Sequence, residues 1–251
     1  MKFKEYIAKN QVFTTADLQE NLDSPGSISK SVTRAVKSGQ IEMVRRGLYV
    51  SKTGRFTDER CDARIIVRAA DPDAFLVYHS ALELHGVAHN VSFDVAFRSA
   101  ALSKGFTYDG INYVRYPYAT ALVQTVRIGA LGGVRATTKE QTLVDCMSYP
   151  GRSGGSEEVI RSLSTMPYLD MDALSSLLSE SSVSLVSRVG WLLDANKEKW
   201  HVDKGLLESL KGRLGSGPYR MDNQSNRSLG WSKEWKLCLP ESKEEVISWT
   251  E

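Results

Sequence analysis

The sequence predicts an α+β protein in which a small, basic N-terminal domain precedes a larger mixed α/β domain. Residues 1–55 carry ten Lys and Arg against five Asp and Glu, whereas the whole chain has a formal net charge of only +2. These residues also change from helical to alternating periodicity, and the rest of the chain mixes both without the regular βα alternation of a doubly wound sheet. A chain of 251 residues can bury two cores. We therefore predict domains at 1–55 and 56–251.

The N-terminal domain is predicted to contain three short helices. "FKEYIAKN" has apolar residues at helical spacing, and "FTTADLQENL" offers Thr14 or Thr15 as the N-cap of a second helix. The third helix is expected over residues 28–38, with Ser27 as its cap and Gly39 at its end.

The third helix separates an apolar face from a basic and polar face. At helical periodicity the apolar stripe comprises Ile28, Val32, Ala35 and Val36, and the opposite face comprises Lys30, Thr33, Arg34 and Lys37. Eighteen residues between Asp23 and Glu42 contain no acid. One face is therefore expected to anchor the helix in a core and the other to meet an anionic partner.

The segment "IEMVRRGLYVS" predicts two short strands joined at Arg45-Arg46-Gly47, where Gly47 can adopt a positive φ. Three helices followed by a β-hairpin form a winged helix-turn-helix, whose third helix enters the DNA major groove while the wing reaches the phosphates or the adjacent minor groove. We therefore predict double-stranded DNA as the partner. The predicted contacts are Thr15, Ser27, Ser29, Lys30, Thr33, Arg34, Lys37, Arg45 and Arg46. A solvated basic face or a protein-binding winged helix is the alternative.

The larger domain begins with a helix at "DARIIVRAA". Strands are expected at "VSFDVAFRS", "FTYDGINYVRY", "ATALVQTVRIG" and "GVRATT", because these segments alternate or are rich in β-branched and aromatic residues. "TKEQTLVDCMSYP" predicts a helix capped by Thr138, and four more helical stretches follow. Residues 215–233 are predicted to form a loop, and "EWKLCLP" a final strand. The tryptophans of the last quarter serve either packing or a partner surface.

No pattern of residues indicates catalysis. His79, His85 and His89 lie close in sequence, but no carboxylate or Cys completes a metal-binding pattern, so we expect neither a metal nor a cofactor. Asp145 and Cys146 have no catalytic partner at a recognisable spacing. We expect a protein that is not an enzyme.

The sequence also predicts a cytoplasmic protein. No apolar run approaches the roughly 20 residues that a membrane helix needs. The N-terminal "MKFKEYIAKNQ" lacks the apolar core of a signal peptide. The three widely spaced cysteines do not suggest a disulfide framework. We therefore expect no membrane partner.

Four motifs occur in a recognisable order: "VFTTADLQ…ISKSVTRAVKSGQIEMVRRGLYV", "DAFLVYHSALELHG", "TTKEQTLVDCM" and "RVGWLLD". Together they resemble the AbiEi-type antitoxins of type IV toxin–antitoxin systems, which act in abortive infection, a form of phage defence. The resemblance covers about residues 10–240 and is most specific at "VRRGLYV" and "HSALELHG".

The resemblance implies a repressor that binds inverted repeats in the promoter of its own operon. It also implies a C-terminal domain that counters a nucleotidyltransferase-like toxin without a stable complex. The DNA-reading positions that it implies lie within residues 29–37 and at Arg45 and Arg46, which the spacing selects as well. No catalytic residue follows from the resemblance.

Two alternatives stay open at the level of sequence. The alternatives to a repressor and antitoxin are a solitary winged-helix regulator without a toxin and a metal-dependent nucleic-acid enzyme that the winged helix targets. One winged helix covers one half-site, so either a weak dimer or two monomers paired on DNA is expected.

Overall fold

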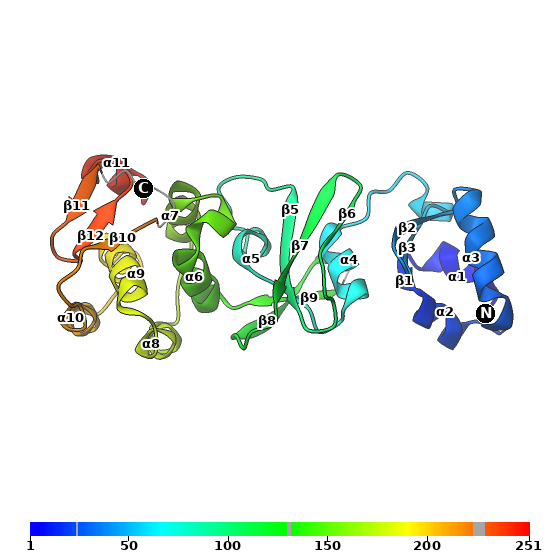
Figure 1. The fold of residues 1–251 in the computed structure, drawn as a ribbon, viewed down its shortest axis with the longest axis horizontal. Helices are drawn as coiled ribbons and strands as arrows, with labels where there is room; N and C mark the ends of the chain where they lie inside the picture. Colours follow the sequence, from blue (N-terminus) through cyan, green and yellow to red (C-terminus); the bar gives the residue numbers. More distant parts are fainter. Residues whose placement is uncertain (24, 130–131, 223–228) are drawn as a thin grey trace. The chain divides into compact units, whose positions relative to one another are not determined.

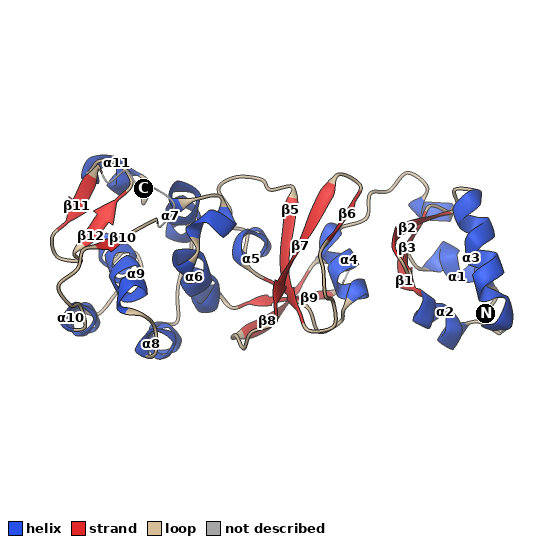
Figure 2. Ribbon diagram, in the orientation of Figure 1, coloured by secondary structure: helices blue, strands red, loops and turns tan. Residues whose placement is uncertain are grey.

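The computed structural model describes residues 1–23, 25–129, 132–222 and 229–251. The fold is mixed α+β, with a small N-terminal module of helices and strands and a larger C-terminal α/β part, as the sequence predicts (Figures 1 and 2). The chain forms two units. Unit 1 comprises Met1–Phe75, Phe93–Ala119 and Thr125–Arg135, and unit 2 comprises Leu76–Ser92, Thr120–Gln124 and Ala136–Glu251.

The N-terminal part of unit 1 is a winged helix-turn-helix, which we call the winged-helix module. Its elements are α1 (Phe3–Lys9), β1 (Val12–Thr14), α2 (Thr15–Asn21), η1 (Pro25–Ser27), α3 (Ile28–Lys37), β2 (Ile41–Arg45) and β3 (Leu48–Ser51). The three helices and the hairpin follow the prediction. Strand β1, which the sequence analysis missed, pairs antiparallel with β3 and gives a sheet of order β1-β3-β2.

An apolar core holds the module together. Ile28, Val32 and Ala35 of α3 are buried in one cluster with Leu18 of α2. Phe13 of β1 belongs to the same cluster, where its ring stacks on Tyr49 with centroids 5.9 Å apart and meets Tyr6 edge-on at 5.8 Å. Burial of these side chains supplies most of the force that holds three short helices, each too short to be stable alone.

The N-terminus of α2 is set by Thr14 rather than Thr15. The Thr14 hydroxyl oxygen accepts a hydrogen bond from the Asp17 amide at 3.1 Å, and the Asp17 carboxylate accepts one from the Thr14 amide at 2.7 Å. This reciprocal pair satisfies amide groups that the first turn of a helix leaves unpaired.

One residue of the predicted apolar stripe is misplaced. Val36 is 37% exposed, because at 100° per residue it lies roughly 70° from the centre of the stripe that Ile28, Val32 and Ala35 form. The buried stripe is therefore narrower than predicted, and Val36 lies at the border of the polar face.

The rest of unit 1 contains η2 (Gly54–Phe56), helix α4 (Ala63–Ala70) and strands β5 (Asp94–Ser99), β6 (Phe106–Tyr108) and β7 (Ile111–Pro117). The strand order is β6-β7-β5. β5 and β7 are parallel, with Val95 opposite Tyr113, and β6 and β7 form an antiparallel hairpin. Its turn, Asp109-Gly110, has positive φ at both residues, which Gly and Asp tolerate better than most residues.

Strands β4 (Phe75–Leu76), β8 (Val123–Arg127) and β9 (Gly133–Thr137) contain three of the five points at which the chain passes from one unit to the other. In unit 2, Leu76 pairs in parallel with Ala136. The helices of unit 2 are α5 (Tyr78–Leu84), α6 (Lys139–Ser148), η4 (Pro150–Ser153), α7 (Ser156–Ser164), α8 (Met171–Ser179), α9 (Val183–Ala195), α10 (Lys204–Gly212) and α11 (Lys243–Ser248). The Thr138 hydroxyl caps α6 as predicted, by accepting from the Gln141 amide.

The segment predicted as a loop at 215–233 is partly sheet, so that prediction is wrong. β10 (Tyr219–Arg220) pairs in parallel with β12 (Leu237–Leu239), and β11 (Gly230–Ser232) pairs antiparallel with it. Residues 223–228 of the predicted loop lie outside the described residues. Strand β12 lies within the predicted final strand "EWKLCLP". Strands β10 and β11 have two and three residues and helix α11 has six, too few to show a periodicity, and none of the three was predicted.

Most tryptophans of the C-terminal quarter are core residues. Trp191, Trp200, Trp235 and Trp249 are buried, whereas Trp231 is 46% exposed. The packing alternative therefore holds for four of the five.

Among the described helices, none combines the length and the apolar character needed to cross a bilayer.

The histidines of the "HSALELHG" segment pair with different groups. His79 Nε2 lies 3.2 Å from Glu158 Oε1, and His85 Nε2 lies 2.9 Å from the Thr137 carbonyl oxygen. Within the described part of the chain, no group of three or more His, Cys, Asp or Glu could hold a metal ion.

Glu158 organises the start of the segment that follows α5. Its carboxylate accepts hydrogen bonds from the amides of His89 and Asn90 and from the Ser162 hydroxyl. Burial by itself raises the pKa of this carboxyl, but those hydrogen bonds and the neighbouring His79 ring together hold the pKa below its ordinary value of 4.5.

Gly190 on α9 lets Trp235 pack directly on the helix backbone. A Cβ at position 190 would lie 2.0 Å from Trp235 Cζ3, much closer than atoms can approach. The glycine of the "RVGWLLD" motif is thus explained by a buried indole that is remote in sequence.

We predict that Gly190→Ala lowers the free energy of unfolding by about 1–3 kcal/mol, because the indole of Trp235 must move out of a packed core. Gly212→Ala is the matched control, since a Cβ there meets nothing within 4 Å and alanine favours the helix by about 0.5–1 kcal/mol. Denaturant unfolding of both variants checks this. Equal stabilities would contradict the close packing at Gly190.

We predict that Glu158→Gln destabilises the protein by about 2 kcal/mol at pH 7, because a charged acceptor of several hydrogen bonds is lost. The native pKa is depressed, so the carboxylate stabilises the fold above pH 4.5 and stops doing so as the pH falls through the native pKa. The difference between variant and wild type should therefore shrink towards pH 3. Glu157→Gln, an exposed neighbour, should change stability by less than about 0.5 kcal/mol. A Glu158→Gln deficit that stays constant with pH would refute this role.

Candidate nucleic-acid interface

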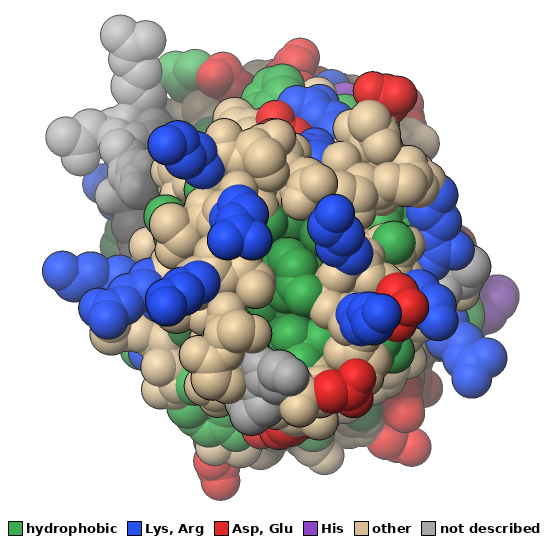
Figure 3. Space-filling model, turned by 90° about the vertical axis from the view of Figure 1, so that its right-hand side faces the viewer, with side chains coloured by type: hydrophobic (Ala, Val, Ile, Leu, Met, Phe, Trp, Pro, Cys, Tyr) green, Lys and Arg blue, Asp and Glu red, His purple; other side chains and the backbone are tan. Residues whose placement is uncertain are grey.

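Helix α3 presents a continuous polar face to solvent. While Ile28, Val32 and Ala35 anchor the helix in the core, the other face carries five exposed predicted contacts: Ser29, Lys30, Thr33, Arg34 and Lys37. Figure 3 faces the part of the structure that carries α3 and shows Lys and Arg side chains spread around an apolar area. The sequence and the fold therefore agree on which side of α3 is free to meet a ligand.

The cations of this face are Lys30, Arg34 and Lys37. Among the described residues, Lys30, Arg34 and Lys37 form no ion pair or hydrogen bond through their side chains. Their charges are therefore available to phosphates or base edges. Thr33 differs, because its hydroxyl donates to the Ser29 carbonyl oxygen at 2.9 Å and so retains only acceptor capacity.

The wing ends in a two-residue turn formed by Arg46 and Gly47, since Arg45 still pairs with Leu48. Gly47 has φ +83°, which a side chain would make unfavourable. Arg46 is exposed and, in the described structure, has no partner. The Thr15 amide donates to the Gly47 carbonyl oxygen at 2.9 Å and so ties the start of α2 to the wing turn.

Arg45 occupies a different environment from Arg46. It is half-buried, its Cζ lies 5.6 Å from the centre of the Phe106 ring, and its Nη1 is buried without a hydrogen bond. The neighbouring Glu42 carboxylate accepts a 2.6 Å hydrogen bond from the Tyr108 hydroxyl. The β6–β7 hairpin thus contacts the outer strand of the wing, a relation between distant segments that periodicity cannot reveal.

The remaining predicted contacts lie at the starts of helices. Ser27 is exposed at the N-cap position of α3, but its side chain makes no cap hydrogen bond. Thr15 is half-buried at the first position of α2.

Two exposed apolar residues were missed as candidates, Val36 on α3 and Met43 on β2, the latter 55% exposed. The helical angle of Val36 was the only sequence signal that could have identified it.

The described residues offer little for covalent chemistry. Burial raises the pKa of the Cys146 thiol and of the Cys61 thiol, each to about 12, so both are protonated at neutral pH and are poor nucleophiles. The Asp145 carboxylate accepts a hydrogen bond from Gln141 on the same helix. The exposed basic face of α3 is therefore the best-defined candidate site.

Comparisons with known proteins agree with this architecture. Residues 3–52 match a family described as "Transcriptional regulator, AbiEi antitoxin", and residues 73–195 match "AbiEi antitoxin C-terminal domain". No curated protein matches the chain. The crystal structure of the RV2827C protein from Mycobacterium tuberculosis is similar in fold, with a TM-score of 0.67 and 18% sequence identity over 96% of this chain and 89% of that chain.

The two family matches follow each other along the chain and together cover most of it. The first spans the winged-helix module almost from end to end, and the second begins before β4 and ends with α9. The chain therefore belongs to the AbiEi-type antitoxins, a family of antitoxins and transcriptional regulators.

Proposed function

We propose that this protein is a DNA-binding repressor and antitoxin of a type IV toxin–antitoxin system, acting in the cytoplasm. In this proposal residues 1–55 bind inverted repeats in the promoter of its own operon, and residues 56–251 counter a nucleotidyltransferase-like toxin without a stable complex. The observation that carries the DNA-binding part is the set of unpaired cations on the exposed face of α3. The family matches support the antitoxin part.

The proposed DNA contacts divide by chemistry. Arg34 and Lys30 lie on the exposed face of α3 and are long enough to donate to guanine O6 and N7, whereas Ser29 and Thr33 suit shorter polar contacts. Val36, exposed at the border of this face, suits apolar contact with a thymine methyl group. Lys37, Ser27 and Thr15 are assigned to the phosphates.

The wing arginines are proposed to act unequally. Arg46 is exposed and unpaired, so it is the residue of the wing that contacts a phosphate or the minor groove. Arg45 packs on Phe106, so we propose that it supports DNA binding indirectly, by holding strand β2 of the wing in position. Because one module covers one half-site, we propose that two monomers, or a weak dimer, pair on adjacent half-sites.

Arg34→Ala is expected to weaken binding to a promoter duplex by about 1–3 kcal/mol, or roughly 5- to 150-fold, and to relax base preference at one position. Lys4→Ala on α1 removes the same charge from a helix outside the proposed interface and should change affinity far less. Gel shifts with the promoter and with scrambled duplex provide the measurement. Unchanged affinity and preference in Arg34→Ala would remove α3 from the interface.

A plot of log affinity against log salt concentration has a negative slope, and Arg46→Ala should reduce the magnitude of this slope by about 0.9 on every sequence. This value corresponds to the loss of one phosphate contact. Arg45→Ala should lower this slope less, because its guanidinium is held on the Phe106 ring. Binding isotherms at 50–200 mM salt for both variants separate the two arginines. Equal slopes would show that the wing presents both side chains alike.

A further inference from the structure

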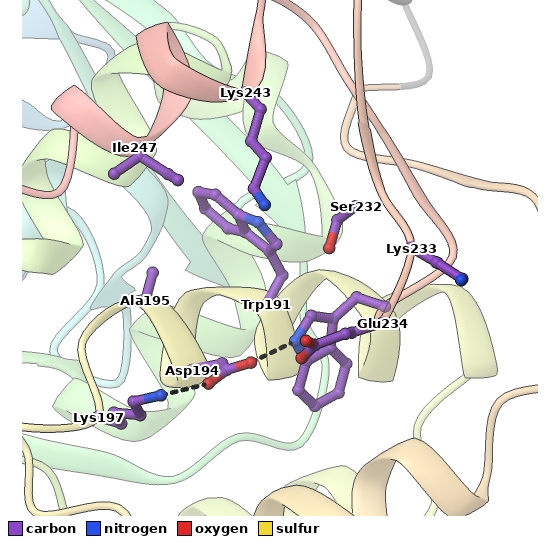
Figure 4. Close-up of a pocket in the computed structure, with 10 residues that line it drawn as sticks. Trp191, Asp194, Ala195, Lys197, Ser232, Lys233, Glu234, Lys243 and Ile247 are labelled. Carbon is purple, nitrogen blue, oxygen red and sulfur yellow. Dashed lines mark hydrogen bonds and ion pairs between the residues drawn. The ribbon is translucent and has the colours of Figure 1, made fainter.

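Unit 2 contains a pocket of about 460 Å³ to which the proposed DNA interface assigns no role. Its walls come from α9, from β11 and the turn before β12, and from α11, as Figure 4 shows. Trp191, Ala195 and Ile247 supply apolar surface, and Ser232, Glu234 and Lys243 supply polar groups. This volume falls within the range of small-molecule sites.

The wall beside the pocket is closely packed and hydrogen-bonded. Trp235 is fully buried against Gly190, and its indole N–H donates to Asp194 Oδ2 at 3.0 Å. Asp194 also lies 3.4 Å from the Lys197 ammonium. A wall held by packing and by charged hydrogen bonds keeps its shape without a ligand, which reduces the cost of binding.

The carboxylates of the pocket already have partners among the described residues, whereas two of its donors do not. Glu234 pairs with Lys211 at 3.1 Å, and Asp194 accepts from Trp235. By contrast, in the described structure neither the Lys243 ammonium nor the Ser232 hydroxyl has a hydrogen bond or an ion pair, although Ser232 is only 8% exposed. The pocket therefore offers unused donors and few unused acceptors.

The unused donors converge on one side of the cavity. In Figure 4 the Lys243 ammonium and the Ser232 hydroxyl point toward the indole of Trp191, whereas the Lys233 ammonium points away. The Ser232 hydroxyl is accessible from the pocket, so a ligand oxygen or a water molecule that enters there can accept a hydrogen bond from it. These donors together match an oxyanion.

We propose that this pocket binds a small organic monocarboxylate, whose carboxylate meets Lys243 and Ser232 and whose apolar body lies along Trp191, Ala195 and Ile247. One ammonium facing the cavity matches one negative charge. Of the other two lysines in the lining, Lys197 lies 3.4 Å from Asp194 and Lys233 points away in Figure 4. A dianionic phosphate would therefore meet one unpaired ammonium while it faces the carboxylates of Asp194 and Glu234. A neutral amide would lack the charge-assisted bond to Lys243.

Phenylacetate and hexanoate are the probes, titrated calorimetrically into the full-length protein, with phenylacetamide and inorganic phosphate as comparisons. Both carboxylates should bind, and phenylacetamide and phosphate at least 10-fold more weakly. Lys243→Met should weaken phenylacetate binding about 10-fold or more, and Ser232→Ala by a smaller factor. Lys233→Met is the matched control and should leave the affinity within 2-fold of wild type. These titrations contain no DNA, so their outcome is independent of the proposed repressor function.

Three outcomes would overturn the proposal. The first is that neither carboxylate binds at millimolar concentration. The second is that phosphate binds as tightly as phenylacetate, and the third is that Lys233→Met weakens phenylacetate binding as much as Lys243→Met does. Lys243 and Lys233 are both exposed, so both variants are expected to fold. Thermal unfolding of each variant confirms that the comparison is between native proteins.

Discussion

The anchoring of α3 by its buried stripe is the interaction on which the N-terminal module depends. Ile28, Val32 and Ala35 lie in one core with Leu18 and Phe13, and their burial decides which side of the helix faces out. A ten-residue helix has little stability of its own. Without this core the cations would remain, but no surface would present them together. The apolar half of α3 is therefore as necessary to the proposed interface as the basic half.

The sequence predicted those parts of the structure that depend on local pattern. The three N-terminal helices, the hairpin and the mixed α+β class follow from periodicity and caps, and the glycine at 47 has the positive φ that the turn required. Val36 shows the limit of this approach, since it was assigned to the apolar stripe although its angle lies well away from the stripe centre. A few tens of degrees separate core from surface on a narrow helix face.

What the sequence could not predict depends on residues that are distant along the chain. Strand β1 has three residues, and its identity depends on the presence of β3 to pair with it. Arg45 and Arg46 are chemically equal neighbours, and only the folded position of Phe106 distinguishes them. Gly190 likewise has no local reason to be glycine, because the indole that requires it lies 45 residues further on. Such constraints emerge only with the tertiary fold.

In the proposed complex with DNA, the shortness of the wing would limit how much of a duplex one module can cover. Strand β2 has five residues and therefore extends about 17 Å, whereas successive major grooves on one side of B-DNA are about 34 Å apart. In the proposed complex, a projection of that size would span the sugar–phosphate ridge that borders the groove assigned to α3 and would stop there. On that proposal each copy would contact roughly half a helical turn, and the spacing of the two contacted segments, rather than the reach of either copy, would determine which operators are recognised.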